Sequence, residues 1–162
     1  MGILIVAIIA LIVIAVVFGE NKKKGINIGN VNGIEYSKYE TNGYVMTQTE
    51  LKFYRELKKV TDRLELTIFP QVDLERIIKV KDNNSSLRGR IKSRSIDFTI
   101  VENTKCKIKC CIELDDYTHN RENVKKADEF KDNLFKQVGI PLYRVKVNNF
   151  YNEEEIEKMI NG

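Results

Sequence analysis

The sequence lacks the patterns that mark several common classes of protein. Its 162 residues contain a single histidine, no Cys-x-x-Cys pair, no internal repeat and no heptad pattern. A zinc site could draw only on Cys106, Cys110, Cys111 and His119, and their spacing matches no common zinc pattern. We therefore interpret the three cysteines as structural residues of a protein in a reducing compartment. The four-residue zinc site is the alternative.

Charged and polar side chains are absent from one stretch near the N-terminus. Residues 3–18 contain only Ile, Leu, Val, Ala and Phe, and as a helix they would span roughly 24 Å. We expect a single-pass transmembrane helix over residues 3–19. A cleaved signal peptide is the alternative, but no Lys or Arg precedes the run and no small-x-small cleavage site follows it. Three lysines follow at residues 22–24, so the positive-inside rule predicts a cell-membrane protein whose remaining chain faces the cytoplasm.

Periodicity distinguishes a tether from a folded domain in the rest of the chain. Residues 20–44 mix Lys, Asn, Gly and Tyr without a period, which is typical of a tether with one short extended piece. Residues 45–162 suffice for one compact domain. The expected elements are a capped helix over 47–60, a strand over 64–69 ended by Pro70, strands over 95–101 and 108–114, a helix over 121–138 stopped by Gly139, a strand over 141–147 and a helix over 152–160. This order predicts an α/β fold, a mixed central sheet of about four strands flanked by helices.

Two acidic side chains are expected to meet on neighbouring central strands. Alternation places Glu113 and Asp115 on one strand face and Cys110 on the other. With a turn at residues 104–106, Asp97 of the preceding strand pairs directly opposite Glu113. Because like charges opposite each other are unfavourable, a cation should lie between them, and a divalent metal is the obvious candidate.

Two groups of basic residues are expected near these acids. A helical wheel places Lys131 inside the apolar arc of the helix over residues 121–138, where it either snorkels at the edge or reaches the acids. A basic stretch precedes the strand of Asp97 and is expected to be mostly loop. It is either a solvated loop or an arm that contacts the phosphates of nucleic acid, through Lys79, Lys81, Arg88, Arg90, Lys92 and Arg94. No aromatic residue interrupts this stretch, so base stacking within it is unsupported.

Residues in most of the region from 45 to 147 resemble the restriction-endonuclease-like PD-(D/E)XK nuclease superfamily, and more closely the bacterial domain-of-unknown-function family 2726. The resemblance rests on Thr49-Glu50 with Phe53-Tyr54 and Leu57, Phe69-Pro70-Gln71-Val72 with Leu74, Ile96-Asp97-Phe98, Ile112-Glu113-Leu114-Asp115-Asp116 with His119, Asp128 with Phe130, and Gly139-Ile140-Pro141-Leu142 with Arg144. The transmembrane segment and the tether lie outside it.

The resemblance implies a restriction-endonuclease-like core and a metal-dependent nuclease. Asp97 and Glu113 would bind Mg²⁺ or Mn²⁺, with Glu50 and Asp115 as further ligands. Asp115 stands where the superfamily has a lysine, and Lys131 could replace that lysine. His119 is either a general acid or base or a structural residue. Glu50 also has a structural explanation as the third residue of a capping box.

The expected function is that of a membrane-anchored Mg²⁺-dependent nuclease that hydrolyses nucleic acid, with DNA before RNA, in defence or repair. Nucleic acid and the membrane are the expected partners, and the resemblance leaves a homodimer open. Two alternatives use the same fold without cleavage. One is a nucleic-acid-binding module that relies on the basic stretch, and the other is a membrane-tethered interaction module whose basic stretch meets anionic lipid.

Overall fold

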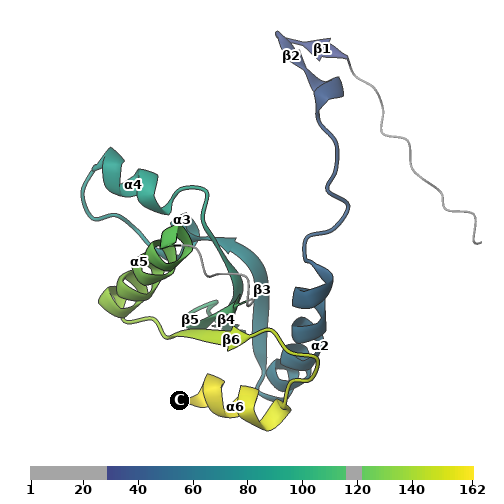
Figure 1. Cartoon of the computed structure of the whole chain (residues 1–162), viewed down its shortest axis with the longest axis vertical. Helices are drawn as coiled ribbons and strands as arrows, with labels where there is room; N and C mark the ends of the chain where they lie inside the picture. The colour runs from purple at the N-terminus through teal and green to yellow at the C-terminus, as the bar shows by residue number, and fades with distance from the viewer. Residues whose placement is uncertain (1–28, 116–121) are drawn as a thin grey trace, which may run out of the picture. The chain divides into compact units, whose positions relative to one another are not determined.

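The structure is a computed structural model that describes residues 29–115 and 122–162 (Figure 1). The predicted transmembrane segment at residues 3–19 lies outside these residues, and so does His119. Among the residues that are described, no helix is long and apolar enough to cross a membrane. The chain divides into two units, Met1–Asn42 and Gly43–Gly162.

The described part of the first unit is a small hairpin followed by a single helical turn. Strand β1 (Asn30–Val31) pairs antiparallel with β2 (Ile34–Glu35), and the 3₁₀ helix η1 (Tyr36–Lys38) follows. Asn32 and Gly33 connect the strands with φ values of 53° and 79°. Positive φ at both central residues is the signature of a type I′ turn, which Asn-Gly favours. The predicted tether therefore contains a hairpin where one extended piece was expected.

The second unit is built around a mixed sheet of four strands in the order β3-β4-β5-β6. Its elements are α2 (Gln48–Arg63), β3 (Leu66–Asp73), α3 (Leu74–Ile77), α4 (Ser85–Ile91), β4 (Ser95–Glu102), β5 (Ile108–Asp115), α5 (Glu122–Val138), β6 (Leu142–Lys146) and α6 (Glu153–Asn161). The pairs β3–β4 and β4–β5 are antiparallel, whereas β5–β6 is parallel. Helix α5 makes the crossover that a parallel pair requires. The predicted α/β class and four-stranded mixed sheet are confirmed.

Hydrophobic side chains fill both faces of this sheet. On one face, α2 and α6 pack on β4 and β5 through a cluster that includes Phe53, Phe98 and Ile112. On the other face, α3, α4 and α5 pack through a cluster that includes Leu74, Cys111 and Phe135. Adjacent strand residues point to opposite faces, so Cys110 and Cys111 belong to different clusters, as expected.

The predicted capping box of α2 and the predicted end of α5 are confirmed, whereas α2 runs to Arg63, three residues beyond its expected end. Thr47 and Glu50 form the reciprocal capping box at the start of α2: Glu50 N–H donates to Thr47 Oγ1 at 3.2 Å, and Thr47 N–H donates to Glu50 Oε2 at 2.6 Å. Helix α5 ends at Val138, and Gly139 follows with φ 72°. Ile140 N–H then donates to Phe135 O at 3.2 Å, which closes the last turn.

Strand β3 does not stop at Pro70, contrary to expectation. It runs through Pro70 to Asp73, with Pro70 paired against Phe98 of β4. The reason is the position of β3 at the edge of the sheet. An edge strand has one side without a partner, so a residue that lacks an N–H group breaks no bond of the ladder there.

The basic stretch is loop only in part. Residues 79–84 and 92–94 are not helical, but between them lies the helix α4, because the Asn84 side chain accepts the Leu87 N–H at 3.1 Å and acts as an N-cap. In β5, Ile108 was expected on the face of Cys110, but it packs with Cys111. A β-bulge between Ile100 and Val101 of β4 shifts the register there and reverses the facing of the residue beyond it.

The packing of the core predicts that replacing Phe53 lowers the stability of the protein much more than replacing Phe69. Phe53 is fully buried and contacts the rings of Phe98 and Tyr151, whereas Phe69 on β3 is 43% exposed. We expect Phe53→Ala to lower the free energy of unfolding by about 3–5 kcal/mol because it leaves a cavity. Urea titration measures this loss, and Phe69→Ala, expected to cost less than about 1 kcal/mol, is the control. Equal losses would contradict the assignment of Phe53 to the core.

Candidate active site

The strand register brings Asp97 and Glu113 together. Phe98 of β4 pairs with Ile112 of β5, and one further step of the same register pairs Asp97 with Glu113. The Asp97 carboxylate also accepts a hydrogen bond from the backbone N–H of Leu114, with 2.8 Å between N and Oδ2. This bond fixes the Asp97 side chain against β5. The two carboxylates therefore lie on adjacent central strands, as the sequence indicates.

Lys131 of α5 joins Glu113 from the helical layer. Its Nζ donates to Glu113 Oε2 at 2.7 Å and to the carbonyl oxygen of Ser95 at 3.1 Å. The two side chains are only 15% and 10% exposed, respectively. Lys131 therefore reaches the acidic pair across the sheet and does not snorkel outward. The carbonyl of Ser95 fixes the position of the ammonium group from a second direction.

A hydrogen-bond chain connects Glu50 to the same site through Gln71. Gln71 Nε2 donates to Glu50 Oε1 at 2.8 Å and to Asp97 Oδ1 at 3.3 Å. Ser95 Oγ in turn donates to Gln71 Oε1 at 3.2 Å. Glu50 thus caps helix α2 with one carboxylate oxygen and accepts a hydrogen bond from Gln71 with the other. The structural and the functional reading of Glu50 are compatible.

Burial raises the pKa of both central carboxyl groups. For Asp97, burial is the largest influence on the pKa; the Leu114 N–H opposes it and the charge of Glu50 adds to it. For Glu113, burial again raises the pKa most, the Lys131 ammonium lowers it, and the charge of Asp97 raises it. Both carboxylates therefore hold their negative charge at a cost in free energy. A cation that binds between them would relieve that cost.

One carboxylate oxygen of Glu113 is suited to bind a metal ion. Glu113 Oε1 is buried and has no hydrogen-bond partner within the described residues, which is costly for a carboxylate oxygen. Carboxylate oxygens are also the donors that Mg²⁺ prefers, and Mg²⁺ is usually held by one or two carboxylates together with water and substrate phosphates. Asp97 and Glu113 fit that mode. No group of three or more His, Cys, Asp or Glu side chains suited to a metal occurs in residues 29–115 and 122–162.

Asp115 is engaged elsewhere, next to the site. Its Oδ1 accepts from Arg144 at 2.9 Å, and the same guanidinium contacts Asp128 at 3.3 Å and Asp132 at 2.9 Å. Arg144 pairs with Glu113 in the parallel register of β5 and β6, and its charge helps to lower the pKa of Glu113. Asp115 therefore ties β5 to β6 and α5 through Arg144, and no described contact joins it to Asp97 or Glu113.

The basic stretch approaches the site only through its last member. Arg94 stacks its guanidinium over the ring of Phe130, 5.5 Å from the centroid, and precedes Ser95 of the site network. The other five members lie in or beside α4 and are exposed: Lys79, Lys81, Arg88, Arg90 and Lys92. Their exposure leaves them accessible to a large anionic partner.

The cysteines do not form the alternative zinc site. Cys106 is exposed, whereas Cys110 and Cys111 are buried on opposite faces of the sheet. Burial raises the pKa of the two buried thiols to about 11 and about 12. Because zinc binds the thiolate form, these two cysteines are poor ligands. His119, the fourth member, lies outside the described residues.

The sequence did not identify Gln71 and Ser95 as residues of the site. Gln71 has a φ of 51° within β3, a backbone conformation that residues other than glycine adopt rarely. Only the register of β3 with β4, which pairs Val72 with Ile96, brings Gln71 close to Asp97. A polar residue directly after Pro70 was the one available signal, and it is weak.

The comparisons with known proteins identify a family and no function. Residues 42–162 match the family described as "Protein of unknown function (DUF2726)". No curated protein matches the chain, and no solved structure does.

The buried ion pair predicts a pH-dependent loss of stability in Lys131→Met. Without the ammonium, the pKa of Glu113 should rise further, because burial is then unopposed by Lys131. A carboxyl group whose pKa is raised by folding stabilises the protein below its ordinary pKa, and this contribution is lost as the pH rises through the folded value. We therefore expect a small loss at pH 4 and a loss of about 3 kcal/mol at pH 8.

Urea unfolding at the two pH values measures this effect. Lys136→Met, at an exposed position on the same helix, is the matched control and should change little. Glu113→Gln combined with Lys131→Met should remove most of the pH dependence. A loss of equal size at pH 4 and pH 8 would show that Lys131 acts by packing and not through the charge of Glu113.

Proposed function

Because the chain belongs to the DUF2726 family, whose description assigns no function, we propose a function from the site itself: metal-dependent hydrolysis of phosphodiester bonds in nucleic acid, with DNA as the expected substrate. The observation that carries this proposal is the buried Oε1 of Glu113, which has no hydrogen-bond partner among the described residues. The same carboxylate bonds Lys131 and lies on the strand next to that of Asp97. The acidic pair is suited to bind a divalent cation, and the adjacent ammonium is suited to bind a phosphate of the substrate.

The residues of the chain have distinct roles in this proposal. Asp97 and Glu113 would hold Mg²⁺ or Mn²⁺, and the ion would supply activation of water and neutralisation of charge on the phosphate. The Leu114 N–H and Gln71 fix the two oxygens of Asp97. Lys131, held by Glu113 and Ser95, is placed to donate to a phosphate oxygen. In the reaction the water oxygen bonds to phosphorus, one ester P–O bond breaks, and the leaving oxygen takes up a proton.

The order of the elements supports a restriction-endonuclease-like core for this reaction. Helix α2 is followed by the antiparallel strands β3, β4 and β5, the last two of which contain the acids, then by the crossover helix α5 and the parallel strand β6, with the short helices α3 and α4 between β3 and β4. In this proposal Lys131 on α5 replaces the lysine that the superfamily has at the position of Asp115. Its contact with Glu113 supports the replacement. Membrane anchorage through residues 3–19 and a cytoplasmic orientation stay part of the proposal.

A second candidate is a module that binds nucleic acid without cutting it. The exposure of five basic side chains around α4 favours it, because such side chains supply affinity for a phosphate backbone without any metal chemistry. The two candidates differ in what Asp97 does. In the nuclease its carboxylate is essential, whereas in the binding module it is a structural residue of the sheet.

Metal-dependent cleavage by the full-length protein in detergent separates these candidates. With Mg²⁺ or Mn²⁺ on plasmid, linear and single-stranded DNA and on RNA, we expect Asp97→Asn and Lys131→Ala each to reduce the rate at least about 100-fold. Asp82→Asn and Lys136→Ala change exposed residues outside the site and should cleave like the wild type. Cleavage lost in Asp97→Asn alone would remove Lys131 from the mechanism. No cleavage by the wild type, with salt-sensitive binding intact, would favour the binding module.

Metal binding should tighten as the pH rises. The carboxyl groups must lose their protons to bind a cation, and burial raises the pKa of both above its ordinary value. We therefore expect the affinity for Mn²⁺, measured by titration calorimetry, to keep increasing between pH 5 and pH 7. Glu113→Gln should weaken binding at least tenfold, whereas Glu129→Gln, at an exposed position of α5, should not. An affinity that is flat over this range would contradict binding by these two groups.

A further inference from the structure

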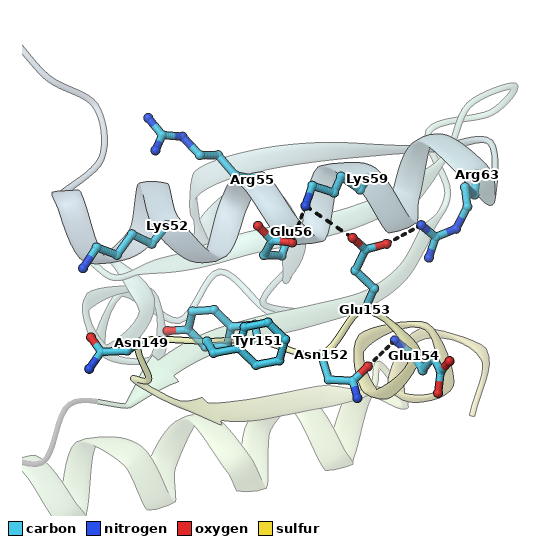
Figure 2. A pocket seen from close by; sticks show the side chains of 11 residues that line it. Lys52, Arg55, Glu56, Lys59, Arg63, Asn149, Tyr151, Asn152, Glu153 and Glu154 are labelled. Carbon is cyan, nitrogen blue, oxygen red and sulfur yellow. Dashed lines mark hydrogen bonds and ion pairs between the residues drawn. The ribbon is translucent and has the colours of Figure 1, made fainter.

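A groove runs between α2 and the segment that connects β6 to α6 (Figure 2). It has a volume of about 800 Å³, and its lining comes from one side of α2 and from the connecting segment with the start of α6. The lining residues belong to the second unit of the chain and lie outside the candidate active site. Two halves with different chemistry make up this groove.

The half toward the C-terminal end of α2 is closed by ion pairs. Lys59 contacts Glu56 at 2.6 Å and Glu153 at 3.3 Å, and Arg63 contacts Glu153 as well as Glu157, the latter at 3.1 Å. Figure 2 shows Glu153 of α6 between Lys59 and Arg63 of α2, so that its carboxylate bridges the two helices. The charges of these pairs are satisfied internally, so the pairs hold α6 on α2 and offer no free cation to a ligand.

The half toward the N-terminal end of α2 has the opposite character. Lys52 and Arg55 are exposed and have no hydrogen bond or ion pair with any described residue. Phe150, which also lines the groove, is 76% exposed. An exposed aromatic ring in a groove that also carries free cations offers a face on which a base can stack. Figure 2 shows Lys52 and Asn149 together at this end, with Glu154 on α6 far from them.

This cationic and aromatic half lies at the same end of the sheet as the candidate site. Strands β5 and β6 are parallel, with Glu113 beside Arg144, and Val147 N–H donates to Asp115 O at 3.0 Å. The chain therefore leaves β6 next to the end of β5. Phe150 follows Val147 by three residues, a span of at most about 11 Å. Helix α2 also starts at this end, because Glu50 contacts Gln71.

We propose that this half of the groove binds a single-stranded segment of nucleic acid, with a base stacked on Phe150 and backbone phosphates at Lys52 and Arg55. An exposed aromatic ring beside unpaired cations is the combination with which proteins bind single strands. In a duplex, the bases are already stacked on each other and cannot reach such a ring. The proposal rests on the proposed nuclease function, because a single strand bound in this half of the groove would lie beside the acidic pair that is proposed to cut it.

The charge pattern favours a nucleic-acid strand over an acidic peptide. An acidic peptide would need cations along the groove, but Lys59 and Arg63 are already neutralised by Glu56, Glu153 and Glu157. Two cations of the groove lining, Lys52 and Arg55, have no ion pair with any described residue, and both belong to the N-terminal half of α2. Two backbone phosphates for Lys52 and Arg55 and one base for Phe150 match these three side chains.

Fluorescence anisotropy with the full-length protein in detergent tests the proposal. EDTA is present so that no strand is cut, and the probes are a labelled 20-nucleotide single strand and a labelled duplex. We expect Phe150→Ala to weaken single-strand binding about 5- to 100-fold and to leave duplex binding within about twofold. Phe150→Trp, which keeps a ring, should bind like the wild type. Phe69→Ala removes another exposed ring and is the control.

The cations are tested by their salt dependence. Lys52→Gln with Arg55→Gln should lower the slope of log affinity against log salt by about 1.4 for the single strand. Lys105→Gln with Lys107→Gln removes the same charge from the β4–β5 turn at the other end of the sheet, and it should not change the slope.

The outcomes separate this proposal from the nuclease proposal. Unchanged single-strand binding in Phe150→Ala, or no single-strand binding by the wild type, overturns the groove proposal even if Asp97-dependent cleavage is found. Weaker binding in Phe150→Ala without any cleavage supports the groove and rejects the nuclease. Binding of a polyglutamate peptide that depends on Lys52 and Arg55, without binding of the single strand, assigns the groove to an acidic protein and overturns the proposal.

Discussion

The ion pair between Glu113 and Lys131 links the sheet to the helical layer above it. Glu113 is buried at the end of a central strand, and its charge is opposed there by desolvation and by Asp97. Lys131 of α5 offsets both effects from outside the sheet, with its ammonium 2.7 Å from the carboxylate, and the charge of Arg144 on β6 adds to it. The carbonyl of Ser95 fixes the same ammonium group. The placement of α5 is therefore coupled to the acidic pair, and any account of the function has to explain why the fold keeps a buried carboxylate with one unsatisfied oxygen.

The two faces of the sheet contribute different parts of this arrangement. Helix α5 packs on one face through Phe135 and delivers Lys131. Helix α2 packs on the other face through Phe53 and delivers Glu50, which reaches Asp97 through Gln71. The acidic pair thus lies where both layers meet the end of the sheet. Side chains that come from separate packed elements are held more rigidly than side chains of one loop, and such rigidity is what a site for a cation and a phosphate needs.

The parallel pairing of β5 and β6 connects this end of the sheet to the groove beside α2. The chain leaves β6 beside Asp115 and leads directly to Phe150, and the first turns of α2 place Lys52 and Arg55 along the same groove. The exposed cations around α4 form a second basic surface. A protein with an acidic centre and two flanking basic surfaces suits a polyanion that is held at several points and acted on at one.

Local patterns in the sequence were sufficient for most of the elements and for the side chains of the acidic pair, but not for α4, for the end of β3 or for the face of Ile108. Alternation placed Asp97 and Glu113 opposite each other, the helical wheel pointed Lys131 inward, and Gly139 ended α5, because side-chain direction repeats with a fixed period in each element. Which strand lies at an edge, which register brings Gln71 to Asp97, and which loop lies beside α2 depend on contacts between distant segments. Only the tertiary structure decided those, since no local period encodes which surfaces pack together. That is why the sequence indicated the acidic pair and the lysine, whereas the glutamine and the groove emerged only from the fold.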